Sequence, residues 1–171
     1  FDRRGKRSDE QLEIFHRLFT EQEPSFDGEF YSIPKVGFEP KPLQTPFPIW
    51  VGGSSPAAFR RVARYGQAFH AAFQKPETVA EEWAAVQREC EKIGRDPGEL
   101  TLSLRGYLDP AAAMEPEKSV GGSKDQMLEM IATLAGIGVS HIMLDPVARG
   151  GVQGRLDALT AFMEDVAPAA A

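Results

Sequence analysis

From Pro48 onward, short apolar runs alternate with segments of helical length. Strands and helices that alternate in this way are typical of right-handed βα units and a parallel sheet. The apolar runs lack regular polar alternation, as expected of parallel strands buried on both faces. The sequence therefore predicts an α/β fold with about four βα units, whose strands we place at 49–51, 68–73, 100–108 and 141–144.

Capping residues and apolar spacing give the helices that follow these strands. Pro56 suits the first position of a helix that ends near Gly66. Ser123 and Gln126 form a capping box, and another helix spans 155–166. The residues expected to face the core are Val79, Trp83, Val86, Cys90 and Ile93 in the helix that begins at Pro76, and Leu156, Leu159, Phe162, Met163 and Val166 in the last helix.

The first 47 residues have a different pattern. Ser8 is expected to cap a helix that Pro24 ends, and 30–33 reads as a short strand. The high proline content of 34–48 forbids a helix and suits an extended surface loop. We therefore expect one domain with two parts, a helix, short strand and Pro-rich insertion over 1–47 and the βα units over 48–171.

Two architectures fit four βα units: a small open doubly wound sheet, and half of an eight-unit barrel. A (β/α)₈ barrel takes about 250 residues, and 48–171 is about half of that length. The chain begins with Phe1 instead of Met, so we expect a further segment upstream.

Composition excludes several classes of protein. The formal net charge of −6 argues against a nucleic-acid partner, and we expect the basic run over 3–7 to be solvated. A single cysteine, Cys90, excludes a disulfide framework, and it lies in an apolar stripe as an inert core thiol. No apolar run is long enough to span a membrane, no signal peptide is recognisable, and we expect a cytoplasmic protein. The three histidines are dispersed, so no metal site is expected.

The strongest local signal for a site is Gly52-Gly53-Ser54-Ser55, between the first apolar run and a helix. Glycines allow backbone N–H groups to approach an anion, and the helix start adds free donors and a positive dipole end. Arg60 lies one turn into that helix. The pattern favours a phosphate site, and a tight turn with a serine cap is the alternative.

Further candidates lie near the ends of the third and fourth strands. A parallel barrel builds its site at these strand ends, where the sequence has Arg105 and Asp109, and then Asp145 and Arg149. A surface ion pair is the alternative for each of them. The run 121–123 is expected to be a helix cap.

The histidines give no catalytic assignment. His70 could face the mouth of a barrel, and a structural role is the alternative. His141 is expected at the opposite, stabilising end. No general acid or base can be assigned from the sequence.

Several motifs in order resemble the luciferase-like monooxygenase superfamily, in particular its oxidoreductases that use the deazaflavin coenzyme F-420. The resemblance covers roughly 1–167, and its motifs are at 4–10, 26–31, 40–42, 48–54, 60–66 and 122–142.

This resemblance implies the C-terminal half of a (β/α)₈ barrel with an insertion at 24–47. It also implies that Gly52, Gly53 and Ser54 hold the cofactor phosphate, and that hydride passes between F-420 and a small organic substrate. An FMN-dependent monooxygenase of the same family is the alternative, because both cofactors carry a phosphate on a ribityl chain. The cofactor-binding residues we expect are Gly52, Gly53, Ser54 and Ser55, followed by Arg60 and Arg105.

A half barrel leaves strand edges and an apolar face uncovered. We therefore expect the chain to pair with a second copy or with the other half of the barrel. The alternative from another class of protein is a non-catalytic binding or assembly module.

Overall fold

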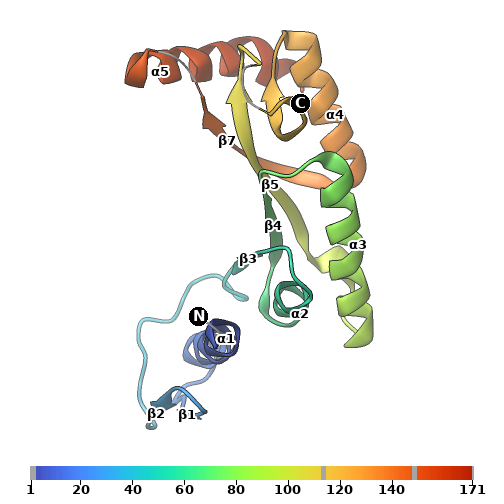
Figure 1. The fold of residues 1–171 in the computed structure, drawn as a ribbon. Helices are drawn as coiled ribbons and strands as arrows, with labels where there is room; N and C mark the ends of the chain where they lie inside the picture. Colours follow the sequence, from blue (N-terminus) through green and yellow to red (C-terminus); the bar gives the residue numbers. More distant parts are fainter. Residues whose placement is uncertain (1–2, 113–114, 148–149, 171) are drawn as a thin grey trace.

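The computed structural model describes residues 3–112, 115–147 and 150–170. Its elements follow the predicted α/β order (Figure 1). They are α1 (Arg4–Thr20), β1 (Phe26–Asp27), β2 (Ser32–Ile33), β3 (Trp50–Gly52), α2 (Pro56–Tyr65), β4 (Ala68–Ala72), α3 (Pro76–Lys92), β5 (Thr101–Asp109), β6 (Ser119–Gly121), α4 (Lys124–Ile137), β7 (Val139–Pro146) and α5 (Gly151–Ala161).

The main sheet has five strands, and every pairing in it is parallel. β5 is central: its Leu104 lies opposite Ala71 of β4 and Ile142 of β7, so these two strands flank it on opposite edges. β6 pairs with the end of β5, on the same edge as β4. β6 has only three residues, and the sequence analysis assigned no strand there.

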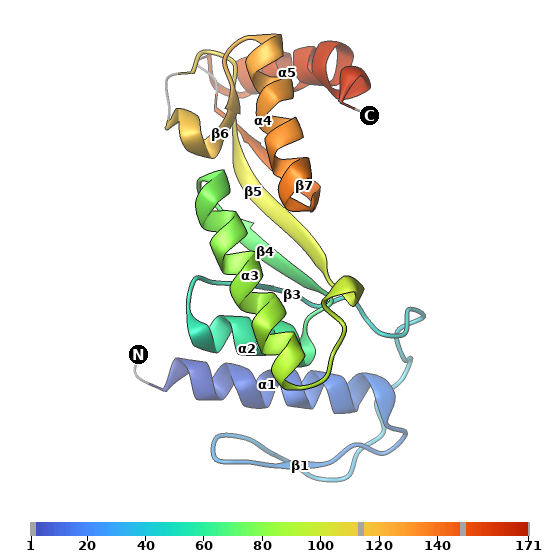
Figure 2. The ribbon, with the colours of Figure 1, turned by 90° about the vertical axis from the view of Figure 1, so that its right-hand side faces the viewer.

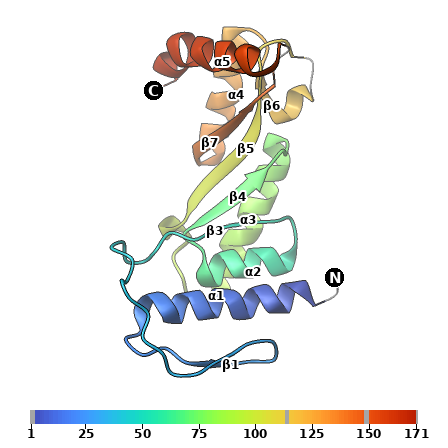
Figure 3. The ribbon, with the colours of Figure 1, turned by 90° about the vertical axis from the view of Figure 1, so that its left-hand side faces the viewer.

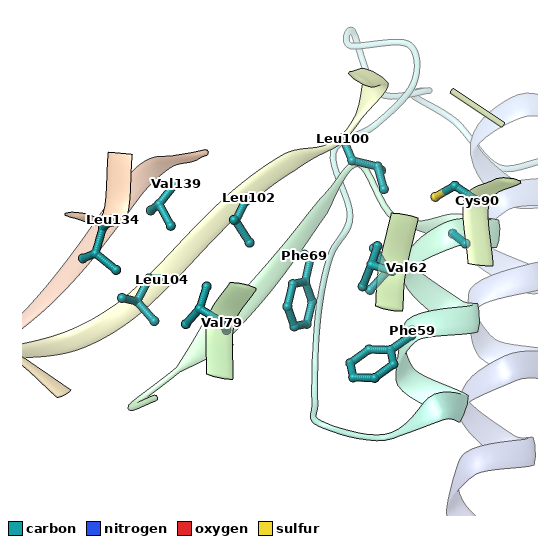
Figure 4. Packing of buried hydrophobic residues seen from close by; sticks show 13 residues of the cluster. Phe59, Val62, Phe69, Val79, Cys90, Leu100, Leu102, Leu104, Leu134 and Val139 are labelled. Atoms are coloured by element: carbon teal, nitrogen blue, oxygen red, sulfur yellow. The ribbon is translucent and has the colours of Figure 1, made fainter. Parts of the chain in front are cut away.

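Helices cover one face of this sheet and leave the other face open. Figure 2 shows α3 and α4 in front of the strands, and Figure 3 shows the strands from the opposite side, where α5 crosses their upper end. Alternate residues of the strands, such as Phe69 and Leu102, point into the core beneath the helices (Figure 4). Phe69 is fully buried, and its ring meets that of Phe59 of α2 edge to face at 5.9 Å. We call the uncovered side the open face.

A second, smaller core lies where β5 and β7 end. Leu108 of β5 and Val120 of β6 pack there with Met127 of α4 and Val166, which follows α5 (Figure 1).

Two helical predictions need correction at their ends. Ile93 is 58% exposed because α3 ends at Lys92. Leu156 and Met163 are exposed as well, and Met163 lies where the last helix changes from α to π geometry over Phe162–Val166. Val79, Val86 and Cys90 are fully buried as predicted, and burial raises the pKa of the Cys90 thiol.

The first helix begins earlier than predicted. α1 starts at Arg4, so Ser8 lies inside it and donates its hydroxyl proton to the Arg4 carbonyl at 3.0 Å instead of capping the helix. The predicted strand over 30–33 shrinks to β2 because Glu10 of α1 competes for its backbone. The Glu10 carboxylate accepts the N–H groups of Phe30 and Tyr31 at 3.0 and 3.1 Å.

α1 is anchored to α2 through polar contacts. Arg61 of α2 forms an ion pair with Asp9 of α1 at 2.6 Å, and the Tyr65 hydroxyl donates to Glu13 at 3.1 Å. In the described part of the chain, no helix has both the length and the apolar character needed to cross a membrane.

Candidate functional site

The loop from β3 to α2 has a backbone path that only glycine fits well. Gly53 has φ +119°, in the region that side chains rarely adopt, and a Cβ there would lie 3.1 Å from the Ala58 Cβ. A Cβ on Gly52 would lie 2.9 Å from the His70 carbonyl oxygen. The two glycines therefore allow the backbone of this turn to pass close to His70 and Ala58 at the carboxyl end of β3.

Two serines complete this loop. Ser55 is the N-cap of α2 as predicted, and its Oγ accepts the Ala58 N–H at 3.2 Å. Ser54 is exposed, and its Oγ accepts a hydrogen bond from Gln74 Nε2 at 2.8 Å. Ala57 adds a first-turn N–H that the helix itself cannot pair. The loop thus gathers backbone and hydroxyl donors at the positive end of a helix dipole, a combination suited to an anion.

A row of side chains extends from this loop across the open face. Gly52, His70, Ser103 and His141 share one register position in four neighbouring strands. The Trp50 ring lies beside this row, 6.0 Å from the His70 ring and 5.4 Å from the His141 ring. Trp50 therefore faces away from the helices, and His141, the third residue of β7, lies in the first half of its strand as predicted.

His70 is the best-defined polar group in this row. Its Nδ1 lies 2.7 Å from the Oγ of Ser103, which is fully buried. Burial, with a smaller contribution from the charge of Arg105, lowers the pKa of His70 below its ordinary value. The ring is therefore mostly neutral near pH 7 and can act as a hydrogen-bond donor or acceptor toward a ligand on the open face.

Arg105 lies two residues beyond Ser103 on the same strand face and forms an ion pair with Asp145. Its Nη2 and Nε are 2.7 and 2.9 Å from Asp145 Oδ2, and its guanidinium lies 5.3 Å from the centre of the Phe73 ring. Asp145 belongs to β7 itself and does not follow the strand as predicted. Arg149 lies outside the described residues.

The other predicted candidates are elsewhere. Arg60 is exposed on α2 and lines a cavity of about 340 Å³ with Asp9 of α1 and Glu89 of α3. This position, beside the outer helices, does not favour contact with an anion in the β3–α2 loop. Asp109 is buried, and its Oδ1 accepts the Ala111 N–H at 3.2 Å.

The second glycine loop is a helix cap. Ser123 Oγ accepts the Gln126 N–H at 3.3 Å and the Gln126 side chain accepts the Ser123 N–H at 2.8 Å, which confirms the predicted capping box. The described residues hold no group of three acidic, histidine or cysteine side chains that could bind a metal ion.

The structure thus brings together Gly52, Gly53, Ser54 and Ser55, places Arg105 on the open face two strands away, and separates Arg60 from them. Sequence reasoning missed Ser103 and Gln74 because their partners come from other segments of the chain. No local motif carries that information.

Comparisons with known proteins show the family to which this chain belongs. Residues 1–115 match the family model described as luciferase-like monooxygenase. The uncharacterized protein Rv0940c of Mycobacterium tuberculosis is 42% identical over 122 residues, which cover 70% of this chain and 42% of that protein. An F420-dependent glucose-6-phosphate dehydrogenase of Segniliparus rotundus is 30% identical over 114 residues, covering 64% of this chain and 34% of the relative. The chain therefore spans about two-fifths or less of the length of these relatives.

The fold also matches a solved structure. An F420-dependent secondary alcohol dehydrogenase in complex with an F420-acetone adduct superposes with a TM-score of 0.81 at 16% identity, covering 98% of this chain and 62% of that one. This likeness concerns the fold alone and confirms the predicted α/β class with a parallel sheet.

Proposed function

Because this chain belongs to the luciferase-like monooxygenase family, we propose that it carries the phosphate-binding part of a flavin- or deazaflavin-dependent oxidoreductase. The observation that carries the proposal is the turn at Gly52 and Gly53, whose backbone, with φ +119° at Gly53, leads directly into the N-terminus of α2. This turn lies at the carboxyl end of a parallel strand, where α/β barrels build their sites.

In this proposal each residue of the loop has its own task. The backbone of Gly52 and Gly53 allows close approach of the phosphate, and the N–H of Ala57 with the hydroxyl of Ser54 donates to it. Ser55 holds the start of α2 in place through its bond to Ala58. When bound, the cofactor supplies the hydride-transfer chemistry, and the protein positions it.

The open face is where the cofactor ring and a small organic substrate would lie. Trp50 offers an aromatic surface there, 42% exposed, and His70 offers a neutral ring nitrogen. The ion pair with Asp145 balances the positive charge of Arg105. Arg105 would therefore serve a ligand as a hydrogen-bond donor held in place more than as a net positive charge.

We infer coenzyme F-420 as the cofactor, with a small organic hydride donor or acceptor as substrate. The relative from Segniliparus rotundus, whose name states F420 dependence, supports this choice. FMN in an enzyme of the monooxygenase type is the alternative, since FMN presents the same phosphate on a ribityl chain.

Gly53→Val tests the loop. The added side chain meets Ala58 and strains a residue with φ +119°, so the turn and its N–H groups are displaced. We expect affinity for the cofactor to fall by about a hundredfold, the loss of several charge-assisted hydrogen bonds. Fluorescence titration with F-420 and with FMN measures this affinity.

Gly37→Ala is the matched control, because nothing lies within 4 Å of a Cβ at Gly37. Unchanged affinity for both cofactors in a folded Gly53→Val protein contradicts the assignment.

A non-catalytic assembly module is the second candidate. Trp50 and Met143 expose apolar surface on the open face, and among the described strands β3 and β7 are each paired along one edge only. A second copy that covers this surface would give a homo-oligomer. Sedimentation that shows self-association, together with no binding of either cofactor at high micromolar concentration, would favour the module over the oxidoreductase.

A further inference from the structure

Ser54 is the end of a chain of side-chain hydrogen bonds that runs into the protein. Gln74 Nε2 donates to Ser54 Oγ at 2.8 Å and also to Glu82 Oε1 of α3 at 3.0 Å. Gln74 lies between β4 and α3, directly after Phe73, which has φ +54°. Three segments that are separate in the sequence thus meet behind the β3–α2 loop.

The carboxylate of Glu82 fixes the direction of these hydrogen bonds. A carboxylate only accepts, so the Gln74 side chain must turn its NH₂ group toward Glu82. The same NH₂ group then faces Ser54, and Ser54 Oγ accepts from it. The opposite orientation of the amide would place its carbonyl oxygen against the carboxylate. The hydroxyl proton of Ser54 therefore remains available to a ligand in the loop.

The hydrogen bonds that join Ser54, Gln74 and Glu82 leave two buried polar atoms without a partner in the described part of the chain, which destabilises the fold. Gln74 Oε1 and Glu82 Oε2 are buried, and neither has a hydrogen-bond partner among the described residues. Buried polar atoms without partners are uncommon and destabilise a fold, so such a pair calls for an explanation. The left-handed backbone at Phe73 adds to that cost.

We propose that Gln74 and Glu82 are positioning residues that hold the Ser54 hydroxyl as a hydrogen-bond donor to the cofactor phosphate. This inference rests on the proposed function of the loop. The ligand is a phosphate on a ribityl chain. What the inference adds is the direction of the hydrogen bonds from Gln74 to Glu82 and Ser54. Glu82 acts through Gln74, and Gln74 acts through Ser54, so neither touches the ligand.

The test compares ligands with and without the phosphate, and FMN and riboflavin are the pair that differs only in that group. The protein expressed from its whole gene is titrated with FMN and riboflavin, and with F-420 and the phosphate-free deazaflavin that corresponds to it. The measured quantity in each pair is the dissociation constant of the phosphate-free ligand divided by that of the ligand with the phosphate. A fold defect lowers both affinities and leaves this ratio unchanged, whereas loss of a phosphate contact lowers the ratio.

Glu82→Gln is the decisive variant, because it keeps the size of the side chain. A glutamine at this position can both donate and accept, so the Gln74 amide is free to turn its carbonyl oxygen toward Ser54. The Ser54 hydroxyl would then donate its hydrogen bond to Gln74 instead of to the phosphate. We expect the ratio to fall about threefold to fivefold, part of the value of one hydrogen bond to a charged group. Glu81→Gln, an exposed neighbour on α3 with the same charge change, is the control and should leave the ratio unchanged.

Ser54→Ala and Gln74→Ala complete the test. Ser54→Ala should lower the ratio about tenfold, and adding Gln74→Ala to it should lower the ratio no further, because Gln74 acts only through the Ser54 hydroxyl that the first change has removed. Equal ratios for Glu82→Gln, Glu81→Gln and the unchanged protein overturn the positioning role and leave the phosphate loop standing. A ratio near one in the unchanged protein, for both ligand pairs, overturns the phosphate loop itself.

Discussion

Ser103 Oγ lies 2.7 Å from His70 Nδ1, and this bond fixes which ring nitrogen carries the proton. Ser103 is fully buried, and within the described part of the chain its hydroxyl has no other hydrogen bond. The hydroxyl therefore donates to Nδ1, and the neutral ring carries its proton on Nε2. His70 thus has a defined donor for a ligand on the open face.

The lowered pKa of His70 predicts a dependence of stability on pH. In the unfolded chain a histidine has a pKa near 6.5, so on acidification the unfolded state takes up its proton first. The contribution of His70 to the free energy of unfolding is complete above about pH 6.5 and is lost as the pH falls toward the folded-state value. Urea denaturation at pH 7.5 and 5.5 measures this loss.

His70→Gln should reduce the difference in unfolding free energy between these two pH values. His16→Gln, on the exposed surface of α1, is the control. If both variants keep the full difference of the unchanged protein, His70 is not a source of the acid sensitivity.

The two tryptophans should report cofactor binding differently. The Trp50 side chain lies on the open face beside His70 and His141, whereas the Trp83 side chain packs against the core beneath the helices. A flavin or deazaflavin bound on the open face should quench Trp50 far more than Trp83. Trp50→Phe should therefore remove most of the quenching seen in a fluorescence titration, and Trp83→Phe should retain it. Quenching that instead disappears with Trp83→Phe would place the ring on the wrong side of the sheet for our proposal.

Tyr65 should matter for the docking of α1. Its burial, together with its hydrogen bond to Glu13, raises the pKa of the phenol to about 12. Tyr65→Phe removes this bond and should lower the free energy of unfolding by about 1–2 kcal/mol. Tyr31→Phe, which loses a bond between two exposed groups, should cost less.

Ultraviolet titration of the phenols checks the same contact. Because the folded-state pKa lies above the unfolded value near 10, stability from Tyr65 is present below about pH 10 and is lost as the pH rises toward 12. A titration curve of Tyr65→Phe that still contains the step near pH 12 would show that another tyrosine is responsible.

Features set by neighbouring residues could be predicted from the sequence. Ser123 and Gln126 are three positions apart, so their capping box needs no knowledge of the rest of the chain. The same is true of Ser55 at the start of α2 and of Val79 and Val86 on one face of α3. The family resemblance, which rests on several such motifs in order, is confirmed by the match over residues 1–115.

Features set by distant segments could not be predicted. The contact of His70 with Ser103 depends on the alignment of β4 with β5, and one residue of slip would turn Ser103 to the other face. Glu10 bonds to backbone about 20 positions away, and this contact removes half of a predicted strand. Gln74 has no local pattern that marks it as a partner of Ser54.

The unequal faces of the sheet also bear on how such a chain can diverge. Core residues such as Phe69 and Leu102 lie beneath the helices, so most of the free energy of folding is independent of what the open face carries. Substitutions at exposed positions there, such as Trp50 or Met143, remove little buried apolar surface and should be tolerated. A lineage can therefore exchange these side chains while the scaffold persists.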